Sequence, residues 1–170
     1  MATIRIHGSE RIVKDQNEVI SFLHEQGVIY ENWNIAKLNP NLVEQYDLSD
    51  NEKNTIIETF REEIEEISER RGYRSWDVIS LSANTPNLDE LLNNFQQEHH
   101  HTDDEVRFIV SGHGVFIIEG QDGNFYEVHL DPGDLISVPE NIRHYFTLSD
   151  DKQVVAIRIF VTKEGWVPIY

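Results

Sequence analysis

The amino-acid sequence predicts a mainly β protein, in which peripheral α-helices pack on the outside of an antiparallel β-barrel or sandwich. Two observations lead to this prediction. From Glu105 onward, short segments rich in β-branched and aromatic residues follow one another closely. Turn sequences such as Asp131-Pro132-Gly133-Asp134 lie between them, as is typical of antiparallel barrels. The predicted strands cover residues 106–110, 115–118, 125–130, 135–138, 145–148 and 154–161.

The first half of the chain is mixed and supplies the predicted helices. The opening residues, 1–7, read as a strand. The run Asp15-Gln16-Asn17-Glu18 is typical of a capping box and predicts a first helix. The run Ser49-Asp50-Asn51-Glu52 repeats this signature and predicts one longer helix that ends at Gly72, while Thr85-Pro86 opens a short third helix. Apolar residues at helical spacing predict the buried face of the long helix: Ile56, Ile57, Phe60, Ile64 and Ile67.

Length and composition restrict the organisation of the chain and its partners. A chain of 170 residues fits a single domain, with a helix-containing region over about residues 1–95 packed on a barrel over about residues 96–170. The net charge of −17 repels nucleic-acid phosphates and anionic lipid, so we expect neither nucleic acid nor membrane as a partner. The absence of cysteine, of a signal-peptide core and of long apolar runs fits a cytoplasmic protein. We also expect a monomer.

The eight residues that end at Glu105 concentrate metal-binding side chains. His99, His101 and Glu105 share odd parity, so in an extended segment they point the same way, and His100 points away. His144 is a further candidate imidazole in a later β-like run. Two or three histidines with one carboxylate form the ligand set of non-haem iron and related octahedral sites. Histidine-rich stretches can also be tags or solvated loops, but this one is internal and leads directly into a strand.

The spacing of these residues resembles the paired motifs of the cupin superfamily. The first motif contains two histidines, a glutamate and a glycine, and it is matched by His99, His101, Glu105 and Gly112. The second contains a glycine, a proline and a histidine, and it is matched by Gly133, Pro139 and His144. Two glycines and an asparagine that are common in these motifs are replaced by Asn93, Asn141 and Leu148. The resemblance implies a cupin-type jelly-roll barrel that holds the metal in its mouth or interior.

Longer segments are similar to the acireductone dioxygenase family of bacterial methionine salvage. The similarity covers nearly the whole chain and includes residues 2–6, 71–73 with 77–79, 98–108, 134–139, and 157–160 with 164–166. It implies that the small-molecule substrate is the acireductone 1,2-dihydroxy-3-oxo-5-(methylthio)pent-1-ene, and that O2 is the co-substrate. It also implies one divalent metal, Fe(II) or Ni(II), with two coordination positions left for water. The implied metal ligands are His99, His101, Glu105 and His144.

In this family, the metal decides the products. The iron form gives formate and 4-methylthio-2-oxobutanoate, the precursor of methionine. The nickel form gives formate, carbon monoxide and 3-methylthiopropanoate. The resemblance therefore implies an enzyme whose outcome depends on which metal is supplied.

Other residues near the predicted ligands are candidates for substrate contacts. Arg107 shares parity with the ligands and is expected to stabilise the substrate oxyanion, the alternative being a salt bridge to an acidic turn. Glu98 is a candidate base or hydrogen-bond acceptor beside the first ligand, or else a solvated glutamate. Phe95 and Phe146 are candidates for packing against the substrate, with a plain core role as the alternative. Arg158 has the parity of inward-facing neighbours and is a candidate second cation.

Two other functions stay open at this point. The first is a different cupin oxygenase that acts on another enediol or diketone, which the pocket for the substrate tail would decide. The second is a non-catalytic metal-binding or small-molecule-sensing cupin. A sensor usually carries a partner domain, and this chain has no room for one.

Overall fold

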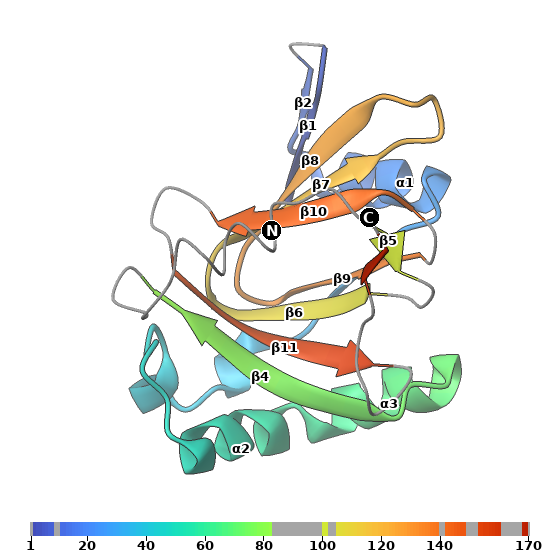
Figure 1. The fold of residues 1–170 in the computed structure, drawn as a ribbon. Coiled ribbons are helices and arrows are strands. Elements are labelled where there is room, and N and C mark those ends of the chain that lie inside the picture. Colours follow the sequence, from blue (N-terminus) through green and yellow to red (C-terminus); the bar gives the residue numbers. More distant parts are fainter. Residues whose placement is uncertain are drawn as a thin grey trace.

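Two antiparallel sheets of five strands each face one another in the computed structural model (Figure 1). The structure describes residues 2–8, 11–82, 100–101, 105–139, 142–148, 153–160 and 168–169, and of residues 100, 101, 105, 168 and 169 it describes only the backbone. The first sheet runs in the order β10 (His144–Leu148), β7 (Gly114–Glu119), β8 (Phe125–Leu130), β1 (Thr3–Ile6) and β2 (Ile12–Val13). The second runs in the order β3 (Ile29–Asn32), β9 (Asp134–Val138), β6 (Glu105–Gly112), β11 (Val154–Phe160) and β4 (Ser75–Leu81).

The predicted antiparallel barrel with outer helices is confirmed. All six strands predicted from Glu105 onward are present, and their described ends lie within two residues of the predicted ones. The strand predicted over residues 1–7 is β1. The first 95 residues also supply β2, β3 and β4, so this half of the chain forms part of both sheets as well as the helices packed on them.

A separate two-stranded sheet joins distant parts of the chain. It pairs β5 (His100–His101) with β12 (Pro168–Ile169) and lies between the two large sheets, at the right-hand side of Figure 1. His101 lies opposite Pro168, and His100 lies opposite Ile169. The predicted histidine-rich segment is therefore tied by backbone pairing to residues near position 170.

Three α-helices cover the barrel in the part of the chain that the structure describes. The helix α1 (Gln16–Glu25) begins at the predicted cap, where the Asp15 side chain accepts from the backbone N–H of Glu18, and it packs against the barrel. The helices α2 (Asp50–Thr59) and α3 (Arg61–Arg71) cover the outer face of the second sheet (Figure 1). None of the described helices is long and apolar enough to cross a membrane. The helix predicted at Thr85-Pro86 lies outside the described residues.

The single long helix predicted after Ser49 is wrong, because the chain breaks at Phe60 into α2 and α3. The predicted capping box at Ser49 and the predicted end at Gly72 are both present. Phe60 itself leaves the helical conformation, with φ −108° and ψ 16°. Its ring is fully buried and lies 4.8 Å from the ring of Phe108, centroid to centroid. Burial of this one ring on the sheet therefore holds the break in place.

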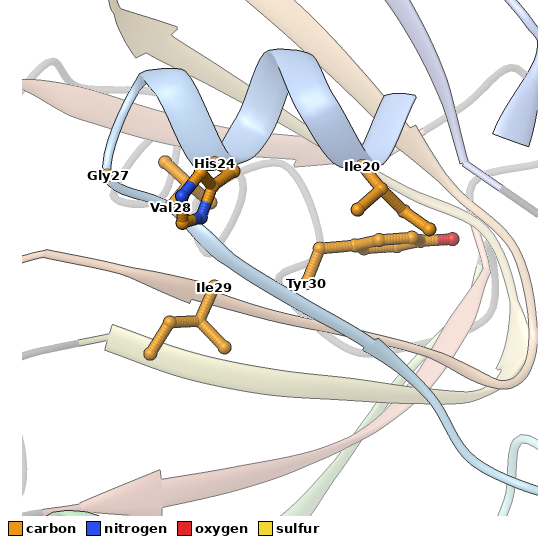
Figure 2. A pocket seen from close by; sticks show the side chains of 6 residues that line it. All are labelled: Ile20, His24, Gly27, Val28, Ile29 and Tyr30. Atoms are coloured by element: carbon orange, nitrogen blue, oxygen red, sulfur yellow. The ribbon is translucent and has the colours of Figure 1, made fainter. Parts of the chain in front are cut away.

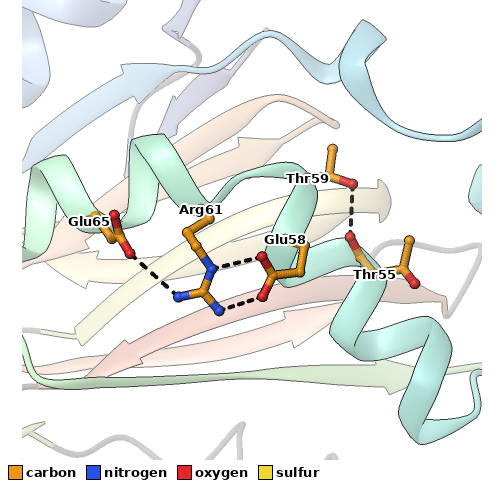
Figure 3. Close-up of polar contacts among 5 residues, drawn as sticks. All are labelled: Thr55, Glu58, Thr59, Arg61 and Glu65. Atoms are coloured by element: carbon orange, nitrogen blue, oxygen red, sulfur yellow. Dashed lines mark hydrogen bonds and ion pairs between the residues drawn. The ribbon is translucent and has the colours of Figure 1, made fainter.

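Side chains on both sides of the break explain how the chain bends there (Figure 3). The hydroxyls of Thr55 and Thr59 donate to backbone carbonyls one turn earlier, at 2.9 and 2.8 Å, and this bonding pattern bends helices. Arg61 then bridges the two helices. It donates to both oxygens of Glu58 in α2 and to Glu65 in α3. These exposed ion pairs link the two helix ends, and their contribution is small because water screens them.

The second sheet separates two cores, because alternate side chains of a strand face opposite sides. On β6, Ile109 faces the inside of the barrel, whereas Phe108 faces the helices. The barrel core consists chiefly of Ile4, Leu23, Ile109, Phe116, Ile118, Tyr126, Val128, Ile136, Phe146 and Ala156. The helix-side core consists chiefly of Ile56, Phe60, Ile64, Ile67, Tyr73, Val106, Phe108, Leu135, Ile157 and Ile159.

Gly112, the glycine of the first cupin motif, ends β6 at a very close backbone contact. Its φ is +73°, and a β-carbon there would stand 2.1 Å from the carbonyl oxygen of Gln153, which directly precedes β11. No side chain fits at such a distance. This motif position therefore has a steric role in the pairing of β6 with β11.

Candidate metal centre in the barrel interior

His144 is the predicted ligand whose side chain the structure describes. It begins β10, lies opposite Ile118 of β7, and is only 1% exposed. Its Nδ1 lies 2.7 Å from the backbone carbonyl oxygen of Ile142. A carbonyl oxygen can only accept, so Nδ1 carries the hydrogen in this contact, and the neutral ring has its lone pair on Nε2. This is the tautomer and the orientation that a metal-ligating histidine commonly has.

The other three predicted ligands fall where side chains are not described. Glu105 is the first residue of β6, with its Cα opposite Val138 of β9. His101 belongs to β5, and His99 lies outside the described residues. Among the side chains that the structure does describe, no three histidine or carboxylate groups gather as a metal site. The convergence of the four ligands is therefore still a prediction.

Arg107 lies inside the barrel. It is 1% exposed and stands two residues after Glu105 on β6. The central carbon of its guanidinium lies 4.3 Å from the ring centroid of Phe146 and 5.6 Å from that of Phe116. Both distances are within the range of a cation–π contact. A buried cation of this kind is suited to binding an anion that enters the barrel.

Phe146 and Phe116 connect the arginine with the histidine. Phe146 shares β10 with His144 and is 1% exposed. Phe116, on the neighbouring β7, has its ring centroid 5.0 Å from that of Phe146 and 6.1 Å from that of His144. Phe116 was not predicted from the sequence. Both faces of its strand are apolar, so neither could be assigned to the barrel interior. The two phenylalanines, Arg107 and His144 form the described part of the candidate site.

Arg158 lies next to Arg107 across the strand pair but is engaged elsewhere. The two residues are directly opposite in the β11–β6 register. The Arg158 guanidinium donates from Nε to Asp77 Oδ1 at 2.8 Å and also bonds to Asp77 Oδ2, from the facing position on β4. It also lies 5.2 Å from the ring centroid of Phe160. Arg158 therefore belongs to an ion pair at the edge of the site.

Asp134 anchors β3 to β9 through a partly buried hydrogen-bond network. Its Oδ1 accepts from the Tyr30 hydroxyl and from Asn32 Nδ2, both at 2.6 Å, and its Oδ2 accepts from the backbone N–H of Asp131 at 2.8 Å. Burial raises the pKa of the Asp134 carboxyl above its ordinary value, against the opposing effect of its hydrogen bonds. The network fixes the start of the strand whose other end, Val138, pairs with Glu105.

Phe95 and Glu98 lie outside the described residues. A groove of about 370 Å³ lies between α1 and β3 and is lined by Ile20, His24, Gly27, Val28, Ile29 and Tyr30 (Figure 2). None of the predicted site residues lines it. We therefore place the candidate site inside the barrel and not at this groove.

Known proteins match this chain over its full length. A model of the ARD/ARD' family matches residues 3–168. Acireductone dioxygenase from Bacillus velezensis is 68% identical over 171 residues, which covers 100% of this chain and 96% of the relative. The one from Bacillus cereus strain ZK is 67% identical over 170 residues, with 100% of both chains covered.

A solved structure matches equally closely. It is the acireductone dioxygenase from Bacillus anthracis with a cadmium ion in its active center. It superposes with a TM-score of 0.98 at 66% identity and covers 100% of this chain and 98% of that one. Together with the two facing antiparallel sheets, this match confirms the predicted cupin-type fold.

Proposed function

This chain belongs to the ARD/ARD' family, and from that premise we propose that it is a metal-dependent acireductone dioxygenase. Its substrate would be 1,2-dihydroxy-3-oxo-5-(methylthio)pent-1-ene, which it would cleave with O2. The observation that carries the proposal within the structure is the group of His144 and Arg107 inside the barrel, joined by two phenylalanine rings. An imidazole whose Nδ1 bonds to a backbone carbonyl, beside a buried cation, suits an anionic substrate held at a metal.

The residues proposed to hold the metal are His99, His101, Glu105 and His144. Two features support them: the tautomer of His144, and the position of Glu105 at the start of β6 on the same strand as Arg107. The cadmium ion in the active center of the Bacillus anthracis relative supports a divalent metal. All four groups are nitrogen or oxygen donors, which Fe(II) and Ni(II) both accept. When bound, such a metal supplies Lewis-acid activation and a template for an enediolate.

The chain's own residues would bind and orient the substrate. The Arg107 guanidinium would donate to an oxyanion of the ionised enediol, and its burial strengthens that attraction because water does not screen it. Phe146 would pack beside the bound substrate. Glu98 is proposed as the base and Phe95 as a contact for the substrate. Arg158, which lies opposite Arg107 and is paired with Asp77, is proposed as a further contact for the substrate.

The experiment that tests the proposal uses apo protein reconstituted separately with Fe(II) and with Ni(II). Acireductone is added under anaerobic conditions. Oxygen is then admitted, and O2 uptake and the products are measured. We expect formate and 4-methylthio-2-oxobutanoate from the iron form, and formate, carbon monoxide and 3-methylthiopropanoate from the nickel form. Absence of O2 uptake with both metals would refute the proposal. Identical products from both forms would refute the role of the metal in choosing them.

Metal analysis of variants tests the ligand assignment separately. His144→Ala and His101→Ala should lose bound metal, because each removes an imidazole from the proposed set. His100→Ala and His113→Ala should keep it, since the first has the opposite parity and the second is exposed. The cytoplasmic location and the monomeric state are further proposals, and sedimentation of the metal-loaded protein checks the second.

A further inference from the structure

Phe116 occupies the centre of the described site and has no role in the proposed function so far. It is fully buried and comes from β7, whereas Arg107 comes from β6, and His144 and Phe146 come from β10. Its ring contacts the Phe146 ring at 5.0 Å, the Arg107 guanidinium at 5.6 Å and the His144 ring at 6.1 Å. Among the described side chains, only Phe116 lies in ring contact with all three of these groups. The Phe116 ring on β7 therefore contacts site residues from both β6 and β10.

An aromatic ring holds a guanidinium in a different way from a carboxylate. The ring face attracts the cation through its quadrupole, so the side chain is oriented while its positive charge is not neutralised. Arg158 shows the other arrangement, because Asp77 takes up its charge directly. The rings of Phe116 and Phe146 can therefore orient the Arg107 guanidinium without themselves neutralising it.

We propose that Phe116 is a positioning residue, which fixes the Arg107 guanidinium against Phe146 in the orientation that binds the ionised substrate. The inference rests on the proposed function, because it assigns Arg107 a substrate-binding role. It adds that the orientation of Arg107 is set by a ring on a different strand.

Gly114 restricts the Phe146 ring, the other ring that contacts Arg107. A β-carbon at Gly114 would stand 2.7 Å from Cε2 and 2.9 Å from Cζ of the Phe146 ring. The glycine is paired on both sides, with Leu130 of β8 and Leu148 of β10, so its backbone cannot easily retreat. Any side chain there would push the Phe146 ring, which lies 4.3 Å from the Arg107 guanidinium. The missing side chain therefore leaves the space in which Phe146 sits.

The test is a double-mutant cycle on kcat/KM with Phe116→Leu and Arg107→Met in the metal-loaded protein. A cation–π contact corresponds to a loss of roughly 3-fold to 30-fold when the ring is removed. We expect Phe116→Leu to lower kcat/KM by that factor at unchanged metal content. In the Arg107→Met background, the same change should cost less than 2-fold, because it acts through Arg107. Phe116→Tyr, which keeps the ring face, should recover most of the loss.

Phe108→Leu is the matched control, because it makes the same change on the strand of Arg107 but in the helix-side core. Its effect on kcat/KM should be small and equal in both backgrounds. Equal losses from Phe116→Leu with and without Arg107 would overturn the proposal. Gly114→Ala is the second arm. It should lower kcat/KM in the wild type and much less in Phe146→Leu, where the smaller side chain leaves room for the methyl group.

Urea unfolding of the same four proteins of the cycle separates this inference from the proposed function. We expect the shifts of the Phe116→Leu and Arg107→Met midpoints to be non-additive, because the two side chains touch. If the wild type takes up no oxygen but the shifts of the unfolding midpoints are non-additive, the proposed function fails and the positioning of Arg107 by Phe116 stands. Additive shifts of the midpoints would refute the positioning of Arg107 by Phe116, whatever the turnover.

Discussion

The barrel core and the helix-side core lie on opposite faces of the same strands, yet they bury different chemistry. The barrel side holds the arginine, the aspartate and the histidine that are buried in the described part of the chain, namely Arg107, Asp134 and His144. The buried serines lie on the helix side: Ser111 bonds to Glu44 in the loop after η2 (Pro40–Leu42), Ser137 to Tyr73, and Ser68 is in α3.

This difference shows that the two faces of one sheet serve different purposes: one stabilises the fold, and the other carries the candidate site. A buried charge costs far more than a buried hydroxyl unless it is matched by a partner. The helix-side core avoids that cost and can contribute fully to folding. The barrel core accepts it at the positions where a metal and an anionic substrate are proposed to bind. Alternation along β9 and along β6 up to Ile109 decides which residue serves which purpose, and the irregular pairing of β6 with β11 beyond Ile109 turns Ser111 to the helix side.

The largest effect is expected when the helix-side core is damaged. Phe108→Ala removes a fully buried ring that lies 4.5 Å from Trp33 and 4.8 Å from Phe60. We expect a loss of about 3–5 kcal/mol in the free energy of unfolding, measured by urea denaturation. The folded fraction should keep normal kcat, because the ring faces away from the site. A fall in kcat at full folding would break the separation between the two cores.

Arg107→Met makes the converse change in the barrel. It removes the cation but keeps an apolar side chain of similar length, so turnover should fall about 100-fold to 1000-fold while metal content is retained. Arg107→Lys should recover only part of the activity, because an ammonium lacks the planar fork. Normal turnover with full metal content would favour a structural role for the arginine.

One hydroxyl in each core gives a comparison at smaller scale. The Tyr126 hydroxyl is buried in the barrel core without a hydrogen-bond partner among the described residues, so Tyr126→Phe should raise stability by about 1 kcal/mol. The Tyr73 hydroxyl, on the helix side, accepts from Arg71 at 3.1 Å and contacts Ser137 at 3.4 Å. Tyr73→Phe should therefore lower stability by about the same amount. Thermal unfolding of both variants measures the two signs, and a common sign would contradict the comparison.

The smallest effect concerns Asp134 and pH. Burial raises its pKa above 3.8, so the folded protein binds this proton more tightly than the unfolded chain does. The contribution of Asp134 to stability is then greatest below pH 3.8 and declines as pH rises through the raised value. Asp134→Asn does not titrate, and the stability of wild type relative to this variant should fall over that interval. The exposed Asp47→Asn is the control. A difference that rises with pH would reverse the sign of the proposed shift.

Much of the fold was predictable because its signals are local. The six strands after Glu105 have β-branched residues and turns within a few positions of one another, and the Ser49 capping box is equally local. The break at Phe60 was not predictable, since the helical spacing continues through it. It depends on the Phe108 ring and on the shape of the sheet beneath. The strand β4 was not predicted for a similar reason, because its extended conformation depends on pairing with β11 at seven positions.

The candidate site was predictable as a list of residues but not as an arrangement. Parity indicated that Arg107 belongs on the side of the predicted ligands, and it is buried in the barrel. Phe116 could not be found in this way, because Val115, Phe116, Ile117 and Ile118 are all buried and the strand shows no alternation. The contact of Phe116 with Arg107 depends on how two sheets face one another. The engagement of Arg158 by Asp77 likewise depends on the pairing of β11 with β4.

The close contact at Gly112 has a consequence for the whole barrel. A one-residue slip of β6 along β11 would bring Ser111 or His113 to the place where even a methyl group would stand 2.1 Å from the Gln153 oxygen. Such a slip would also exchange the faces of the strand, turning Phe108 inward and Arg107 out against the helices. One missing β-carbon thus excludes an inside-out version of the sheet. Gly112 thus favours the register that keeps Arg107 inside the barrel, although it is not itself proposed to contact metal or substrate.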